Sequence, residues 1–170
     1  IRAMRMVRQD TVLFLVGPVE PAFKQELIEL AQACGVTNRV VLQGMVPSED
    51  LKALAASADI GLQVQRNVGL NSYHCAPIKL FQYLAAGLPV VGSNFPGMVD
   101  IIEKNEVGLC VDPEDDAAIA SAINRILDDE ALHQHLSQNA LRIAREKYCY
   151  EVEGRPLLDA VEELLGNRPD

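Results

Sequence analysis

Short apolar segments alternate with amphipathic stretches along the whole chain. The segments that predict strands are Thr11–Val16, Arg39–Leu42, Ile60–Val64, Pro89–Gly92 and Gly108–Val111. Between the first two, the apolar positions recur at helical spacing and the stretch ends at Gly35; they are Phe23, Leu27, Leu30, Ala31 and Cys34. This alternation predicts an α/β fold, with a mostly parallel sheet covered by helices on both faces.

Further helices are expected in the remaining gaps. Ser48, followed by acidic residues and Leu51, predicts a helix start. Residues 115–127 and about 130–148 continue the helical spacing. A last helix follows Gly154-Arg155-Pro156, and its apolar positions are Leu157, Leu158, Val161, Leu164 and Leu165.

The segment from Pro77 to Val91 joins a helix start, a small-residue helix end and a buried strand without spare residues. Pro77 is tolerated where the backbone N–H would be unpaired, and Ala85-Ala86-Gly87 ends the helix close to the sheet. The free N–H groups at the start of such a helix favour an anion. We therefore expect a ligand crevice at this point of the fold.

The same segment resembles the donor-binding helix of glycosyltransferases with the two-domain GT-B architecture, especially family 4. Members of that family often carry Pro-x-Lys-x-x-Glu-Tyr-x-Ala-x-Gly-x-Pro-Val-Val here, and Gln82 replaces the glutamate that typically binds the ribose. The resemblance continues in family order through Phe14–Gly17, Asn38–Val46, Ala58–Leu62 and Gly108–Pro113. It implies a Rossmann-like domain that forms one half of a GT-B enzyme.

The resemblance also implies that residues 1–170 are the C-terminal, donor-binding domain of a longer enzyme. Family members begin this domain with a strand, a Gly-Arg loop and a Lys-Gly pair that clamps the donor diphosphate, whereas this sequence opens after that loop. We expect a truncated N-terminal edge, an open sheet edge near residues 11–16, loose packing or dimerisation of residues 1–10, and no activity of this chain alone. Arg2, Arg5 and Arg8 are either substitutes for the clamp or the solvated face of a helix.

The reaction implied by the resemblance is metal-independent transfer of a sugar from UDP or GDP to an acceptor hydroxyl, without a cofactor. Gly44, Met45 and Val46 are the candidates near the nucleobase, and Gln82 is the candidate near the ribose. The candidates near the diphosphate and the sugar are His74, Cys75, Ala76, Ile78 and Lys79. His74 and Lys79 are the candidate catalytic residues, and their simpler interpretations are a loop histidine and an exposed helix lysine.

Composition and net charge argue against several classes of binding partner and site. Fifteen basic and 24 acidic residues give a net charge of −9, which argues against nucleic-acid binding. No apolar run approaches the ~20 residues of a membrane span, and residues 1–8 lack the apolar core of a signal peptide. The four cysteines form no Cys-x-x-Cys pair that would indicate a zinc or redox site. We expect a cytoplasmic enzyme, or one held at the inner membrane through its acceptor domain.

Several other features have simpler explanations. His133 and His135 point in different directions on a helix, and the acidic run Asp112–Asp116 suits a helix N-terminus. The loop Arg66–Tyr73 is a candidate flexible lid.

Two alternative functions stay open. One is a noncatalytic relative of these enzymes, and the other is another GT-B nucleotide-sugar enzyme such as an epimerase.

Overall fold

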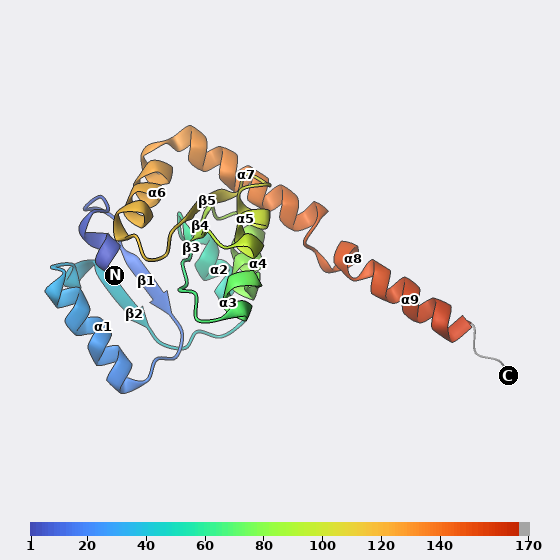
Figure 1. Cartoon of the computed structure of the whole chain (residues 1–170), viewed down its shortest axis with the longest axis horizontal. Helices are drawn as coiled ribbons and strands as arrows, with labels where there is room; N and C mark the ends of the chain where they lie inside the picture. Colours follow the sequence, from blue (N-terminus) through green and yellow to red (C-terminus); the bar gives the residue numbers. More distant parts are fainter. Residues whose placement is uncertain (167–170) are drawn as a thin grey trace.

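The computed structural model describes residues 1–166 as parallel strands in two sheets, surrounded by helices (Figure 1). In the first sheet, β1 (Leu13–Val16) pairs with β2 (Val40–Gln43). The second sheet has the order β3 (Gly61–Gln63), β4 (Val90–Ser93), β5 (Gly108–Val111), so that β4 is central. The predicted α/β class and the parallel pairing are confirmed, and every strand overlaps its predicted range.

Helices cover both faces of the second sheet. The α-helices are α1 (Pro21–Ala33), α2 (Leu51–Ala56), α3 (Leu70–His74), α4 (Ile78–Ala85), α5 (Pro96–Ile102), α6 (Asp116–Asp128), α7 (Glu130–Glu146), α8 (Tyr150–Glu153) and α9 (Arg155–Gly166), and the short 3-10 helices are η1 (Arg2–Arg5) and η2 (Thr37–Arg39). Val90 shares one apolar cluster with α4, α5 and α7, and Val91 shares another with η1 and α6. Because neighbouring strand residues point to opposite faces, β4 is buried on both sides.

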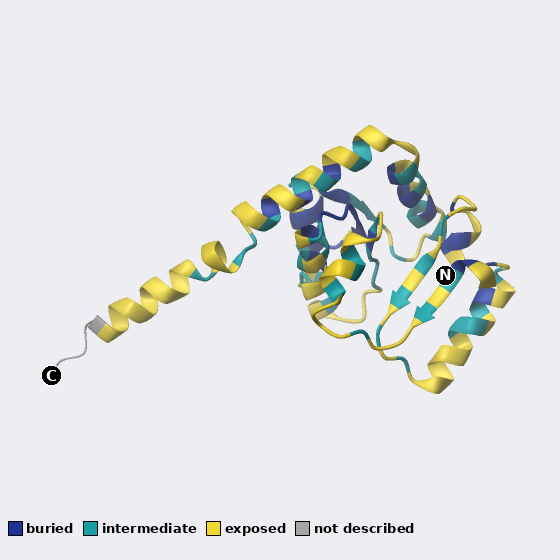
Figure 2. Cartoon of the chain, turned by 180° about the vertical axis from the view of Figure 1, so that it is seen from behind, coloured by how far each residue is buried: buried dark blue, intermediate teal, exposed yellow. Residues whose placement is uncertain are grey.

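The first sheet buries only one face. Half-buried and exposed residues alternate along β1 and β2, and Phe14 and Val41 are 44% and 38% exposed. Figure 2 shows this alternation on the two strands, which no helix covers on the side in view. A single sheet was predicted, but no strand among residues 1–166 joins β1 to β3. The open edge expected near residues 11–16 is therefore present on β1.

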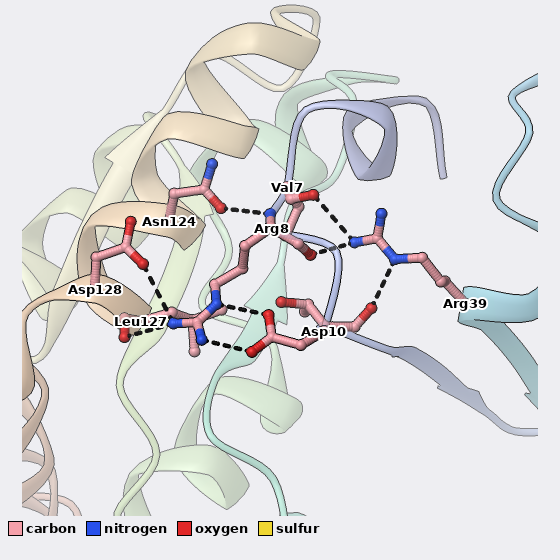
Figure 3. A network of polar contacts seen from close by, with 8 residues as sticks. Val7, Arg8, Asp10, Arg39, Asn124, Leu127 and Asp128 are labelled. Carbon is pink, nitrogen blue, oxygen red and sulfur yellow. Dashed lines mark hydrogen bonds and ion pairs between the residues drawn. The ribbon is translucent and has the colours of Figure 1, made fainter.

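Residues 1–10 are well packed, which contradicts the expected loose packing. Ala3, Met4 and Val7 are buried against α6. Arg39 is 6% exposed and donates hydrogen bonds of 2.6–3.1 Å to four carbonyls, those of Met4, Val7, Arg8 and Thr11. Figure 3 shows the bonds to Val7 and Arg8. This guanidinium holds a segment that has no ladder hydrogen bonds of its own, together with the Asn124 side chain, which accepts the Arg8 amide and donates to the Met6 carbonyl.

The arginines of this segment face α6 and solvent. Arg2 pairs with Asp116, and Arg8 pairs with Asp10 and Asp128 (Figure 3). Arg5 is exposed. These contacts support the interpretation of the three arginines as a solvated face rather than a diphosphate clamp.

One predicted helix start is wrong. The helix expected to begin at Ser48 begins at Leu51, and the Ser48 hydroxyl contacts the Glu49 carboxylate instead of a backbone N–H. The amide of Asp50 donates to the carbonyl of Pro47, and this turn delays the helix.

The last two helices extend away from the body of the molecule (Figure 1). The apolar side chains of α9 are exposed; they are Leu157, Leu158, Val161, Leu164 and Leu165. The main contacts of α9 are with α8. Among the described residues, no helix is long and apolar enough to span a membrane.

Candidate functional site

The start of α4 combines a proline N-cap, a buried apolar side and an exposed polar side. Pro77 is the N-cap, with φ −66° and ψ 145°, and its carbonyl accepts the Leu80 amide at 2.9 Å. The amides of Ile78 and Lys79 fall in the first turn, where an α-helix offers no intrahelical acceptor. Leu80 and Leu84 are fully buried on the sheet side, whereas Lys79 and Gln82 are exposed. No acceptor in the described part of the chain binds the Ile78 and Lys79 amides, so the helix presents two free amides, a cation and an amide side chain toward solvent.

The end of α4 fixes its position on the second sheet. Gly87 has φ +74°, and a side chain at this position would press against Leu141 of α7. The Gly87 carbonyl accepts the Ser137 hydroxyl at 2.7 Å, and the Leu88 amide donates to the Tyr83 carbonyl. This exit leads directly into β4, as the small-residue pattern predicted.

His74, Cys75 and Ala76 form the connection from α3 to α4. His74 is exposed, and Cys75 and Ala76 are half-buried. The Cys75 amide donates to the Asn71 carbonyl at 2.9 Å, so this amide is not free for a ligand. Gly97 at the start of α5 lies against the backbone of His74 and Cys75, where a side chain would collide with it. The connection is thus held close to α5.

The candidate lid between β3 and α4 is partly helical. Residues 70–74 form α3, and the turn before it is closed by side chains: Asn67 accepts the Gly69 amide at 3.1 Å and the Ser72 hydroxyl accepts the Val68 amide at 2.9 Å. The ring of Tyr73 packs 5.3 Å from that of Phe95. Residues 70–73 of the predicted lid are therefore helical, and side-chain hydrogen bonds close the turn before them.

Gly44, Met45 and Val46 lie at the carboxyl end of the first sheet. Met45 is 74% exposed, and the Gly44 carbonyl accepts the Gly17 amide at 3.3 Å. A hollow of about 200 Å³ lies beside them, lined by residues that include Leu15, Phe23 and Gln43. Within residues 1–166, no hydrogen bond or ion pair connects residues 44–46 to α4. The structure therefore leaves the predicted site in two groups, one at each sheet.

Sequence reasoning missed three polar residues beneath the α3–α4 connection. They are Gln63 at the end of β3, Gln65 just after it, and Ser93 at the end of β4, which is fully buried. The Gln65 side chain donates to the Ser72 carbonyl at 2.8 Å. The signal was available, because glutamines at alternate positions of an apolar strand point to the same face.

The remaining titratable candidates have structural partners. His133 contacts the Asp59 carbonyl at 2.9 Å, and His135 lies 3.5 Å from the Glu106 carboxylate. The Asp115 side chain accepts the amides of Ala117 and Ala118, which confirms helix capping as the role of this acidic run. Burial raises the pKa of the Tyr83 hydroxyl, which contacts the Leu62 carbonyl at 3.5 Å.

Comparison with known proteins places these features in context. An uncharacterized glycosyltransferase of Methanocaldococcus jannaschii is 31% identical over 153 residues, which cover 89% of this chain and 37% of that protein. The D-inositol 3-phosphate glycosyltransferase of Salinispora tropica is 30% identical, over 97% of this chain and 35% of that protein. The chain thus spans about a third of the length of these relatives.

Solved structures agree on the fold. HepE of Anabaena, in complex with UDP, superposes with a TM-score of 0.83 at 19% identity and covers 95% of this chain and 43% of its own. The sucrose-phosphate synthase of Thermosynechococcus elongatus gives a TM-score of 0.84 at 25% identity, over 98% of this chain and 41% of its own. The family model for glycosyl transferases group 1 matches residues 1–142. The chain therefore belongs to the glycosyl transferases group 1 family.

Proposed function

We propose that this chain binds the nucleoside diphosphate of a nucleotide sugar at the start of α4 and serves as the donor half of a metal-independent glycosyltransferase. The observation that carries the proposal is the exposed first turn of α4, in which two unpaired amides and Lys79 lie together. The structural relative HepE was solved with UDP and with UDP-glucose, which makes UDP the first nucleotide to test.

Glycosyl transfer requires a positive electrostatic potential at this site. In the transfer, the bond between the sugar and the diphosphate breaks, the acceptor oxygen bonds to the sugar, and the acceptor hydroxyl loses its proton. The leaving diphosphate gains negative charge, so the amides of Ile78 and Lys79 and the Lys79 ammonium stabilise the transition state more than the ground state. If these groups suffice, a chelator such as EDTA leaves the affinity for UDP unchanged.

The other candidate residues take positions around the diphosphate. Gln82 lies one turn after Ile78 on the exposed side of α4, where an amide is able to donate to and accept from a ribose diol. His74, Cys75 and Ala76 border the phosphates or the sugar from the α3–α4 connection. In this proposal, Gly44–Val46 contact the nucleobase through backbone groups when the nucleotide bridges the two sheets.

Titration of UDP and GDP into the chain tests this site by calorimetry. Lys79→Ala is expected to weaken UDP binding at least tenfold, because a charged group facing the diphosphate is lost. Gln82→Ala should weaken UDP binding by ~1 kcal/mol, the value of one neutral hydrogen bond. Gln82→Glu should leave UDP binding intact or strengthen it, through charge-assisted hydrogen bonds to the ribose. Lys24→Ala, on the exposed side of α1, is the matched control. If Lys79→Ala, Gln82→Ala and Gln82→Glu all bound UDP as tightly as the unmodified chain and the Lys24→Ala control, α4 would be excluded from the binding site.

We further propose that residues 1–170 are one domain of a longer protein, which contributes a strand between β1 and β3. Parallel strands direct successive amides to opposite edges. The Gly17 amide points to β2 and the Gly61 amide points to β4. By this alternation, the amides of Phe14 and Val16 point to the free edge of β1, and the amides of Leu62 and Val64 point to the free edge of β3. The order β2-β1 and β3-β4-β5 matches a doubly wound sheet that lacks its first strand.

Hydrogen exchange distinguishes this domain proposal from a complete domain. In the longer protein, the amides of Phe14, Val16, Leu62 and Val64 should exchange at least tenfold more slowly than in this chain. The amides of Leu15 and Gln63 already face a partner strand and serve as internal controls. If each of the six amides exchanged at the same rate in the longer protein as in this chain, the proposal of an inserted strand would be contradicted.

A noncatalytic relative is the second candidate, and Gln82 is the observation that favours it. This amide lacks the charge of the glutamate that family members carry at the corresponding position, so donor binding is weaker. In that case the longer protein would bind UDP but would not hydrolyse or transfer the sugar of UDP-sugars, and Gln82→Glu would not restore turnover. Turnover by the unmodified longer protein would exclude this candidate.

A further inference from the structure

A polar cluster of two buried residues and one half-buried residue lies beneath the segment that leads into α4. Its members are Gln63, Gln65 and Ser93. Ser93 is 0% exposed and Gln63 is 8% exposed. Such residues are unusual at the floor of an apolar sheet, because a buried polar group is stable only when its hydrogen bonds are made.

Ser93 fixes the backbone of Gln65. Its hydroxyl accepts the Gln65 amide at 2.8 Å and donates to the Gln65 carbonyl at 2.9 Å. The ladder between β3 and β4 ends at Gln63 and Gly92, so this side chain extends the pairing by one further position. Gln65 therefore has a defined position although it lies outside the strand.

The Gln65 side chain holds the connection above it. Its Nε2 donates to the Ser72 carbonyl at 2.8 Å and lies 3.9 Å from the Cys75 sulfur. On the other side, Gly97 abuts the backbone of His74 and Cys75. The chain from Ser72 to Cys75 is thus held between Gln65 and α5, and only Ala76 and Pro77 separate it from α4.

The cluster is costly for stability. The Gln65 Oε1 accepts the Gln63 Nε2 at 3.3 Å, but the buried Gln63 Oε1 has no hydrogen-bond partner within residues 1–166. A buried acceptor without a partner destabilises the folded state. Apolar side chains at this place would avoid that cost, so the polar pair indicates a role other than stability.

We propose that Gln65 is a positioning residue, which holds the Ser72–Cys75 backbone and thereby sets the nucleotide affinity of the α4 start. The inference rests on the proposed function of α4. It assigns to Gln65 no direct contact with the nucleotide. Loss of its Nε2 donor should release the connection without unfolding the sheet below it.

Two variants of the full chain test this role. Gln65→Met keeps the length of the side chain but removes both hydrogen-bonding groups, and Gln65→Glu keeps the acceptor but removes the Nε2 donor. Gln32→Met, at the exposed end of α1, is the matched control. Each variant is compared with the unmodified chain by hydrogen exchange of residues 68–76, by urea unfolding and by titration with UDP.

The expected result is a separation of affinity from stability. In both Gln65 variants the amides of residues 72–76 should exchange at least fivefold faster and UDP should bind about fivefold more weakly, the effect of one hydrogen bond. The urea midpoint of Gln65→Met should fall, because the buried Gln63 Nε2 and the Ser72 carbonyl lose their partner, whereas Gln65→Glu keeps the acceptor for the Gln63 Nε2 and should lose less. Equal losses of UDP affinity in two variants of different stability are not expected of a merely structural role. The control variant should match the unmodified chain in all three measurements.

The outcomes that overturn the inference are specific. Unchanged exchange of residues 72–76 in both variants shows that Gln65 does not hold the connection. Faster exchange with unchanged UDP affinity shows that the connection does not set the affinity. If the unmodified chain binds no UDP, the proposed function fails, whereas the exchange measurement still decides whether Gln65 holds the Ser72–Cys75 backbone.

Discussion

The two sheets of this chain show two ways of ordering parallel strands. In the second sheet, β4 has a hydrogen-bonded partner on each side and is buried on both faces. In the first sheet, each of β1 and β2 has one strand partner, and one face is open to solvent. The second sheet is therefore ordered by its own ladder and core.

The first sheet depends on a side chain instead. Arg39, just before β2, binds carbonyls on both sides of the turn that enters β1 (Figure 3). A guanidinium has five donors in a fixed plane, which suits several carbonyls at once. A sheet with an unpaired edge is thus stabilised by a buried cation whose hydrogen bonds go mainly to backbone oxygens, with one to the Gln9 side chain.

Replacement of Arg39 should have the largest effect on this comparison. Arg39→Met leaves four carbonyls without their donor and should lower the free energy of unfolding by about 3 kcal/mol or more. Arg39→Lys should recover only part of the loss, because an ammonium is a point charge with three donors. Urea unfolding measures both, with the exposed Arg125→Met as control. A loss below ~1 kcal/mol would show that the first sheet is held in another way.

The valines of the two sheets offer a direct contrast of intermediate size. Val91→Ala, in the fully buried β4, should cost about 2 kcal/mol through lost burial and a cavity. Val41→Ala, 38% exposed on β2, should cost less than ~1 kcal/mol. The comparison of the two sheets would be wrong if urea unfolding gave equal losses for the two variants.

The smallest expected effect concerns pH. Burial, followed by the nearby charge of Glu103, raises the pKa of the Cys110 thiol on β5 from 9.0 to about 12. The unfolded chain loses this proton near pH 9 while the folded chain keeps it, so stability falls as the pH rises from about 9 toward 12. Cys110→Ala should reduce this fall in urea midpoints, and Leu109→Ala, which removes no titratable group from β5, should not. A fall of the same size in both variants would assign it to other groups.

The sequence predicted local features better than long-range ones. The apolar run of β5 and the passage from α4 through Gly87 to β4 follow from residues that are neighbours in the chain. The start of α2 was wrong because the Pro47–Asp50 turn competes with the Ser48 cap. The packing of residues 1–10 could not be foreseen, since it depends on Arg39, 28–35 residues away from the groups it binds.

The candidate site shows the same limit. Lys79 and Gln82 were named through the resemblance, and the structure shows only that both are exposed on α4. Gln65 was missed, because its partners Ser72 and Ser93 come together only when the sheet forms. The relation of Gly44–Val46 to α4 depends on how two sheets are placed, which no local pattern encodes.

The projecting helix α9 affects how this chain will melt. A helix of 12 residues whose main contacts are with the short α8 has little tertiary support, and helices of that length are marginal in water. Its helix content should therefore decline gradually on heating, before the cooperative transition of the sheets. Circular dichroism would record this as a sloping native baseline, whereas the tyrosines packed beside α4 would report the cooperative transition alone.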